Sequence, residues 1–307
     1  MTLLHVALIG LLTGLHAASW GAYKDSQFEG FKLSSFFRSV VLGLVIAVTI
    51  ALTTDLAEAD SVLVFIGVCY ALERLFTEWW KSILREDDQN AYAIPMRLAV
   101  HGKTIDDRVR RYAVGATIAV GLVAACWVTE GIQAALPPLP VWTALVVASV
   151  GGWLTAVGGA WKDAPVEGFS GWKFLRSPAV SAAWGVLLVG FTTDWVTLTV
   201  AAAGWSVVSI ETYKTSLTGN RPPGKFDTKP VRFAVGELRE ACRAVHVGLY
   251  VVLAIAVSAP LAVPSSAHPG QATAQVVVAL AAAMAGGLVL AQPRSRSVVL
   301  TGAESAA

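Results

Sequence analysis

Long apolar runs separated by short polar stretches recur along the whole chain. A helix that crosses a hydrocarbon core of ~30 Å needs about 20 residues, and nine runs approach that length. Side chains within them are continuously apolar rather than alternating, which excludes membrane-spanning strands. The predicted helices cover approximately 3–20, 39–55, 61–80, 112–131, 141–160, 177–193, 196–213, 245–263 and 273–292.

Composition supports the same fold class. Hydrophobic residues make up 55% of the 307 residues and charged residues only 14%, with a mean hydropathy of +0.61, whereas soluble domains are about 25% charged. We therefore predict an all-α integral membrane protein. The net charge of +2 is too small to indicate a nucleic-acid partner. The five histidines form no cluster along the sequence, and we expect His246 to be a helix-end residue.

One stretch of the chain is written twice. The sequence GAYKDSQFEGF from Gly21 to Phe31 recurs 138 residues later as GAWKDAPVEGF from Gly159 to Phe169, and ten of the nineteen positions from Gly21 to Ser39 are identical to their counterparts. The retained residues are mostly charged residues and glycines, which an apolar chain has least reason to keep for packing alone. We interpret the two copies as two halves of one site.

The duplication predicts the organisation of the chain. Residues 1–135 and 136–265 each form a four-helix repeat, and residues 266–307 add a ninth helix and a tail. Because four is even, the repeats run parallel and are related by an axis along the membrane normal. Lys and Arg gather in alternate loops, which predicts an outside amino terminus and a cytoplasmic carboxyl terminus in the plasma membrane. Both motif copies then lie on the cytoplasmic side.

The motif carries paired carboxylates and adjacent cations. Four-residue spacing puts both acids of each copy on one helical face, a pattern suited to Mg²⁺ that bridges to phosphate oxygens. Neighbouring Lys and Arg side chains would bind the remaining phosphate charge. The acids are Asp25, Glu29, Asp163 and Glu167, and the cations are Lys24, Arg38, Lys162 and Arg176. The alternative is an interfacial segment whose acids simply pair with neighbouring basic residues.

Further charged residues flank the same side of the membrane. The pairs Glu78 with Lys81 and Glu211 with Lys214 end the third and seventh predicted helices. They either form local ion pairs or add a carboxylate and a cation to the same site. One or two turns deeper, Glu73 and Arg74 are a functional hypothesis by default, although they can pair with each other. A Gly/Pro-rich loop carries Arg221 and Lys225, two further residues predicted to contact phosphate. The loop either folds over the phosphate as a lid or only connects two helices.

The plan resembles that of UbiA-type intramembrane prenyltransferases and cyclases. The resemblance covers the number of helices and two acidic motifs four helices apart. It implies that Asp25, Glu29, Asp163 and Glu167 hold Mg²⁺ and a prenyl diphosphate, and that the prenyl chain lies in a membrane-level cavity. Two features depart from the family. The motifs begin Lys-Asp and close on Glu, whereas the family has an Asn-Asp start, and one helix rather than two precedes the first motif.

Three functions fit the pattern. The first is a membrane-embedded prenyltransferase or terpene cyclase, in which Mg²⁺ assists departure of diphosphate. The second is a transporter or flippase of an anionic lipid-like substrate, disfavoured because the predicted spans hold few ionisable residues at mid-membrane. The third is a non-catalytic scaffold. A blind charged site favours the enzyme, and a pathway that reaches Asp55 and Asp194 favours transport.

Overall fold

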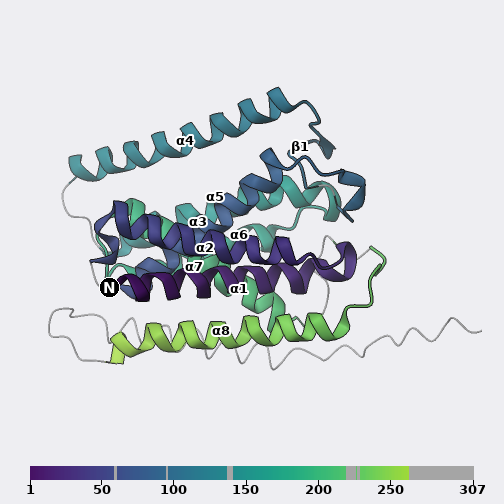
Figure 1. Cartoon of the computed structure of the whole chain (residues 1–307). Helices are drawn as coiled ribbons and strands as arrows, with labels where there is room; N and C mark the ends of the chain where they lie inside the picture. Colours follow the sequence, from purple (N-terminus) through teal and green to yellow (C-terminus); the bar gives the residue numbers. More distant parts are fainter. Residues whose placement is uncertain (59–60, 95, 137–140, 219–225, 227–228, 263–307) are drawn as a thin grey trace, which may run out of the picture.

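The computed structural model describes residues 1–58, 61–94, 96–136, 141–218, 226 and 229–262, and within them the chain is almost entirely helical (Figure 1). Eight α-helices follow one another in these parts of the chain. They are α1 Leu3–Glu29, α2 Leu33–Thr53, α3 Val62–Trp79, α4 Arg108–Ala135, α5 Val141–Glu167, α6 Gly171–Leu188, α7 Trp195–Ser216 and α8 Gly236–Ala262. The prediction of an all-α fold is confirmed.

Short elements join the helices. A π-helical turn, η2 (Trp80–Leu84), continues α3, and 3-10 turns form at η1 (Asp55–Ala57) and η3 (Gln89–Ala91). A two-stranded antiparallel hairpin, β1 (Ala99–Val100) with β2 (Lys103–Thr104), lies in the linker before α4.

Four helices, α1, α2, α4 and α5, are long and apolar enough to cross a membrane, which supports a membrane protein. Each of the first eight predicted spans overlaps one helix, but the helices are longer than the spans at several ends. The predicted ninth span, 273–292, lies outside the described residues.

The repeated sequence forms repeated local structure. Helices α1 and α5 each contain 27 residues. Helix α5 begins 138 positions after α1 begins and ends 138 positions after α1 ends, and α6 likewise begins 138 positions after α2. Each long helix packs against the helix that follows it, α1 on α2 and α5 on α6. Helix α5 continues to the same relative end despite Pro165 within it. The motif is therefore the last two turns of a helix and the turn after it in both copies.

A glycine in the left-handed region ends each of these helices. Gly30 has φ 76° and Gly168 has φ 82°, and the N–H of each donates to a carbonyl four residues earlier, at Ser26 and Ala164, at 2.9 Å. Glycine adopts such a positive φ freely because it has no Cβ, whereas other L-residues are strained there.

We expect Gly168→Ala to lower the free energy of unfolding by about 1–2 kcal/mol. No atom lies within 4 Å of the position that the new methyl group would take, so the cost is conformational and not steric. Thermal unfolding of the purified protein measures it. Gly171→Ala is the matched control, since that glycine also meets nothing within 4 Å and has no positive φ. Equal stability of both variants would contradict the role assigned to the left-handed turn.

Helices α3 and α7 cross at the centre of the molecule. Gly67 of α3 and Gly204 of α7 let the two backbones touch, because a Cβ on Gly204 would overlap the carbonyl oxygen of Gly67. Small residues at such a crossing allow the close packing that drives helix association in membranes. Helix α8 packs against α1 and α7 on one flank, and α4 contacts α7 and η2 on the opposite flank (Figure 1).

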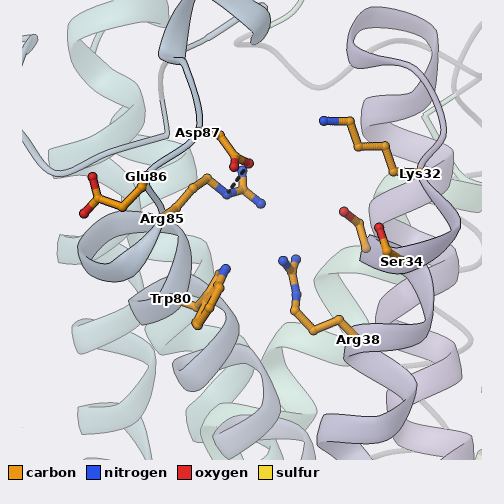
Figure 2. Close-up of a pocket in the computed structure, with 8 residues that line it drawn as sticks. Lys32, Ser34, Arg38, Trp80, Arg85, Glu86 and Asp87 are labelled. Atoms are coloured by element: carbon orange, nitrogen blue, oxygen red, sulfur yellow. Dashed lines mark ion pairs between the residues drawn. The ribbon is translucent and has the colours of Figure 1, made fainter.

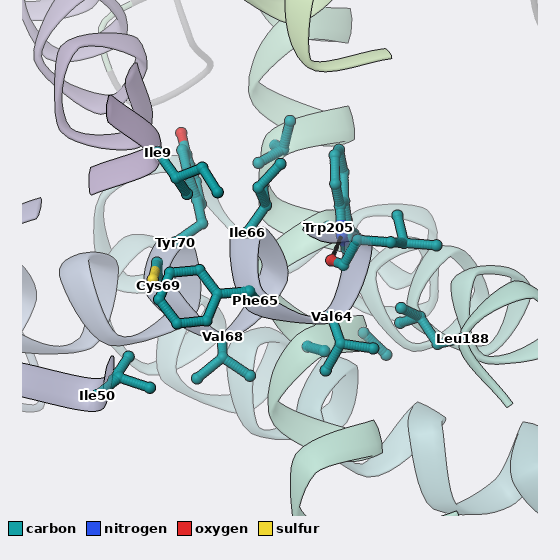
Figure 3. Packing of buried hydrophobic residues seen from close by; sticks show 14 of the residues in the cluster. Ile9, Ile50, Val64, Phe65, Ile66, Val68, Cys69, Tyr70, Leu188 and Trp205 are labelled. Atoms are coloured by element: carbon teal, nitrogen blue, oxygen red, sulfur yellow. Dashed lines mark hydrogen bonds between the residues drawn. The ribbon is translucent and has the colours of Figure 1, made fainter. Parts of the chain in front are cut away.

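An apolar core fills the half of the bundle that lies away from the motif. It is built from the first turns of α1, the last turns of α2 and the first halves of α3 and α7, and includes Ile9, Ile50, Phe65, Ile66, Leu198 and Trp205 (Figure 3). Trp205 stacks on Trp184 with ring centroids 4.6 Å apart, and its Nε1 donates to the carbonyl of Leu63 at 2.8 Å. Polar groups are concentrated in the other half.

Candidate functional site

Predicted site residues from both halves meet at the motif end of the bundle. Nζ of Lys162, in the second motif copy, lies 2.5 Å from Oε2 of Glu78 at the end of α3. The other oxygen of Glu78 lies 3.1 Å from Lys81 and 3.8 Å from Arg74. The local pair of Glu78 with Lys81 is therefore present, but Glu78 also joins the first half of the chain to the second.

Arg74 is the centre of a group of charged side chains that we call the charge cluster. Its members are Glu73, Arg74, Glu78, Lys81, Lys162 and Glu211. Its guanidinium lies 3.3 Å from Glu211 of α7, 3.8 Å from Glu73 and 3.8 Å from Glu78. Its side chain is 14% exposed and that of Glu73 is fully buried, so water screens these charges little. The sequence suggests that Glu73 and Arg74 pair with each other, and the structure adds two further acids beside Arg74, Glu78 and, from the other half, Glu211.

Lys81 lies in η2, just beyond α3, among several cations. Burial lowers the pKa of Lys81 to about 8; Glu78 opposes this shift, and the charges of Lys24, Arg74 and Lys162 add to it. Below that pH the protonated amine adds to a local concentration of positive charge.

The motif acids lie beside basic residues. Oδ1 of Asp25 is 3.3 Å from Nζ of Lys24, and Oε2 of Glu167 is 3.0 Å from Nζ of Lys173. Glu29 and Asp163 each bury one carboxylate oxygen. In the described parts of the chain, no three His, Cys, Asp or Glu side chains are grouped so that they could hold a metal ion. The geometry gives the Mg²⁺ prediction no support, and the pairing of acids with basic neighbours holds for Asp25 and Glu167.

The two motif arginines occupy equivalent places. Arg38 in α2 and Arg176 in α6 are half-buried, and the Nε of each is buried with no hydrogen-bond partner among the described residues. At the end of α7, Lys214 interacts electrostatically with Arg176 and Asp163. Arg221 and Lys225 lie outside the residues that the structure describes, so their role stays a prediction.

A cavity of about 330 Å³ opens beside Arg38 (Figure 2). Lys32 and Arg38 face it from the start of α2, and Arg85 and Asp87 face it from the segment after η2. The full lining consists of Lys32, Ser34, Ser35, Arg38, Trp80, Arg85, Glu86 and Asp87. We call this cavity the basic pocket.

Asp87 only partly balances the cations of the basic pocket. It lies 3.8 Å from Nε of Arg85 and accepts a hydrogen bond from the Tyr92 hydroxyl at 2.6 Å. That hydrogen bond, followed by the charges of Arg85, Lys32 and Arg38, lowers the pKa of Asp87, although burial acts in the opposite direction. Asp87 is therefore ionised at neutral pH and fixed at one side of the pocket.

Glu86 is occupied elsewhere. Its carboxylate pairs with Arg111 and lies 3.2 Å from Arg108, and it points away from the open space in Figure 2. Burial alone would raise the pKa of Glu86, but hydrogen bonds from Tyr112 and Arg111 outweigh this and lower it. Three cations and one acid therefore face the interior of the basic pocket.

Sequence reasoning missed a polar group in the middle of the bundle. The rings of His16 and His246 stack with centroids 3.6 Å apart, and Nδ1 of His16 lies 3.0 Å from the Tyr70 hydroxyl. The expectation that His246 is a helix-end residue was wrong, because His246 lies well inside α8. The histidines form no cluster along the sequence, but two of them meet in the folded bundle. The two histidines are 230 positions apart on α1 and α8, so no spacing along the sequence could reveal their contact.

No protein-family model matches the chain, and comparisons with curated proteins and with solved structures give no match. The assignment of a function therefore depends on the geometry of the charge cluster, the basic pocket and the central polar group.

Proposed function

We propose that the protein is a membrane-embedded enzyme that binds a phosphate-bearing lipid through the basic pocket and acts on it near the membrane surface. The observation that carries this proposal is the convergence of Lys32, Arg38 and Arg85 on one cavity (Figure 2). Arg side chains bind phosphate oxygens in pairs of charge-assisted hydrogen bonds. The buried, unpartnered Nε of Arg38 and the hydroxyls of Ser34 and Ser35 add further donors.

A blind site supports an enzyme over a carrier. The apolar core lies between the charge cluster and the far end of the bundle. At that far end, Asp194 caps α7 by accepting a hydrogen bond from the N–H of Thr197 at 2.6 Å, and Asp55 belongs to η1. These two acids have structural places there, and packed apolar side chains separate them from the cations.

The most specific substrate class is an isoprenoid diphosphate, used by a prenyltransferase or terpene cyclase. In that reaction the allylic C–O bond breaks and its electron pair leaves with the diphosphate oxygen. Fixed cations stabilise the charge that develops on this leaving group. We propose that Arg38, Arg85 and Lys32, which line the basic pocket, take that role. The proposed orientation keeps the motif end of two four-helix units on the cytoplasmic side of the plasma membrane.

A transporter or flippase of an anionic lipid is the second candidate, because ionisable residues at mid-membrane are typical of coupled carriers. His16, Tyr70, Glu211 and Arg74 form a buried group of ionisable residues inside the bundle, which would serve that role if it lies at mid-membrane depth. The same basic pocket would then bind the head group without chemistry.

We expect Arg38→Gln to weaken binding of farnesyl diphosphate at least tenfold, a loss of about 1.4 kcal/mol, because a charged donor is replaced by a neutral one. Isothermal titration calorimetry on the full-length protein in nanodiscs measures the binding. The three compounds are farnesyl diphosphate, inorganic pyrophosphate and a soluble analogue of phosphatidic acid, each titrated with and without Mg²⁺. Release of pyrophosphate is followed in the same samples. Release indicates the enzyme, whereas binding without release indicates the carrier.

Arg110→Gln is the matched control, because Arg110 is exposed on α4 and lies outside the basic pocket. It should bind all three compounds as the wild type does. Equal binding by the Arg38 variant and the wild type would contradict the proposed phosphate site. Stronger binding of pyrophosphate than of the lipid-bearing compounds would point to a soluble phosphate and against a lipid substrate.

A further inference from the structure

Three side chains from three helices form a continuous hydrogen-bonded chain inside the bundle. His16 of α1 contacts the Tyr70 hydroxyl of α3 at 3.0 Å, and that hydroxyl donates to Oε2 of Glu211 of α7. His16 and Tyr70 are 0% exposed and Glu211 is 5% exposed. His16 is the midpoint of α1, eight residues before Lys24, or about 12 Å along the helix at 1.5 Å per residue. These three hydrogen-bonded side chains thus connect the middle of the bundle to the charge cluster.

The positions of the protons follow from these partners. Glu211 is ion-paired with Arg74 at 3.3 Å, and an ionised carboxylate only accepts hydrogen bonds. Tyr70 therefore gives its single proton to Glu211 and must accept from Nδ1 of His16. Neutral His16 then carries its proton on Nδ1, and its Nε2 presents a lone pair.

That lone pair is buried without a donor. Nε2 of His16 has no hydrogen-bond partner in the described part of the chain. The stacked His246 does not supply one, since its Nδ1 lies 3.0 Å from the His16 carbonyl and its Nε2 lies 3.3 Å from the Thr212 hydroxyl. Leaving a buried acceptor unpaired costs about 1–3 kcal/mol, and such a group in a native structure calls for a role.

Charged and titratable groups on four helices interact with His16, Tyr70 or Glu211. They are Lys24 on α1, Glu73 and Arg74 on α3, Lys214 on α7 and His246 on α8. Beyond Glu211, Arg74 connects the hydrogen-bonded side chains to Glu78. Glu78 lies beside Lys81 and Lys162 at the end of the bundle.

We propose that His16, Tyr70 and Glu211 form a proton relay between the middle of the bundle and the charge cluster. A proton binds Nε2 of His16, the proton on Nδ1 moves to the Tyr70 oxygen, and the original hydroxyl proton moves to Oε2 of Glu211. Imidazole and phenol are both neutral again, and the carboxylate has become a carboxylic acid. No redox partner is needed. The relay stands whether or not the basic pocket binds phosphate, because it shares no residue with that pocket.

The test follows both ends of the relay in the full-length protein in nanodiscs. Solid-state NMR of ¹⁵N-histidine reports the tautomer of His16, whose signals are assigned by their loss in His16→Gln. Infrared difference spectra report protonation of Glu211, assigned by loss of its band in Glu211→Gln. We expect the Nδ1–H tautomer at neutral pH. As the pH falls, the shift to Nε2–H and the appearance of the Glu211 acid band should share one midpoint.

Tyr70→Phe removes the hydroxyl that connects His16 to Glu211 and keeps the aromatic ring of residue 70. His16 should then lose its preference for the Nδ1–H tautomer at neutral pH, because the acceptor that fixed this tautomer is gone, while Glu211 remains ionised. Tyr250→Phe is the control, because this hydroxyl on α8 interacts with Ser209 instead, and it should leave both signals unchanged. The relay would be refuted by an Nε2–H tautomer in the wild type, by separate midpoints for the two groups, or by a His16 tautomer that Tyr70→Phe does not change. Thermal unfolding establishes that each variant is folded.

Discussion

Gly204→Ala should lower the free energy of unfolding by about 3 kcal/mol, at the upper end of the usual cost of overpacking. The new methyl group would overlap the Gly67 carbonyl oxygen and lie 3.0 Å from the backbone nitrogen of Ala71. Both obstacles are backbone atoms, so no side chain can rotate to relieve them. Helices α3 and α7 must separate, and the contacts between Arg74 and Glu211 must lengthen with them.

Gly131→Ala is the matched control for this prediction. Gly131 also lies inside a helix, α4, but nothing is within 4 Å of its added methyl group. Alanine is a better helix former than glycine by about 1 kcal/mol, so this variant should be as stable as the wild type or slightly more stable. Thermal unfolding in one lipid composition compares the two. Similar destabilisation by both changes would show that the contact between α3 and α7 is not tight.

Arg74→Met should cost about 3–5 kcal/mol, the usual loss when one partner of a buried ion pair is removed. Methionine keeps much of the apolar stem but leaves Glu73 and Glu211 facing each other without the guanidinium between them. The measurement is the unfolding midpoint in detergent, compared at several pH values. Acid conditions should reduce the defect, because protonation of these carboxyl groups removes the uncompensated charge.

A second substitution separates charge from packing. If the defect of Arg74→Met is electrostatic, adding Glu211→Gln should recover part of the lost stability, since it removes one of the stranded negative charges. If the double variant is less stable than Arg74→Met alone by the full cost of Glu211→Gln, the two residues are not coupled. Arg110→Met, at an exposed position on α4, should change stability by no more than about 0.5 kcal/mol.

The sequence predicts the elements well because hydrophobic length and repetition are local properties. The repeat located the motif, and the matching ends of α1 and α5 follow from it. Span ends were less accurate, because α1, α5 and α8 continue as helices past their apolar runs into charged residues. Charge alone therefore does not end a helix in this chain; Gly30 and Gly168 do so for α1 and α5.

The site was predicted in part. The structure brings Glu78, Lys81, Lys162 and Glu211 together at the motif end of the bundle, and their roles in binding stay predictions. Two features depend on contacts between distant helices and leave no trace in local spacing. These are the stacking of His16 on His246 and the placement of Arg85 opposite Arg38 across the basic pocket.

Arg74 also bears on whether the two halves are still interchangeable. Where α3 carries Glu73 and Arg74, the equivalent turn of α7 carries Ser206 and Val207, yet Glu211 of α7 depends on Arg74 for its counter-charge. Two copies of the second half alone would bury two such acids with no equivalent arginine. A gene encoding the second half alone could therefore no longer replace the fused chain by self-association. The second half thus takes part of the charge balance of its buried acid from the first half.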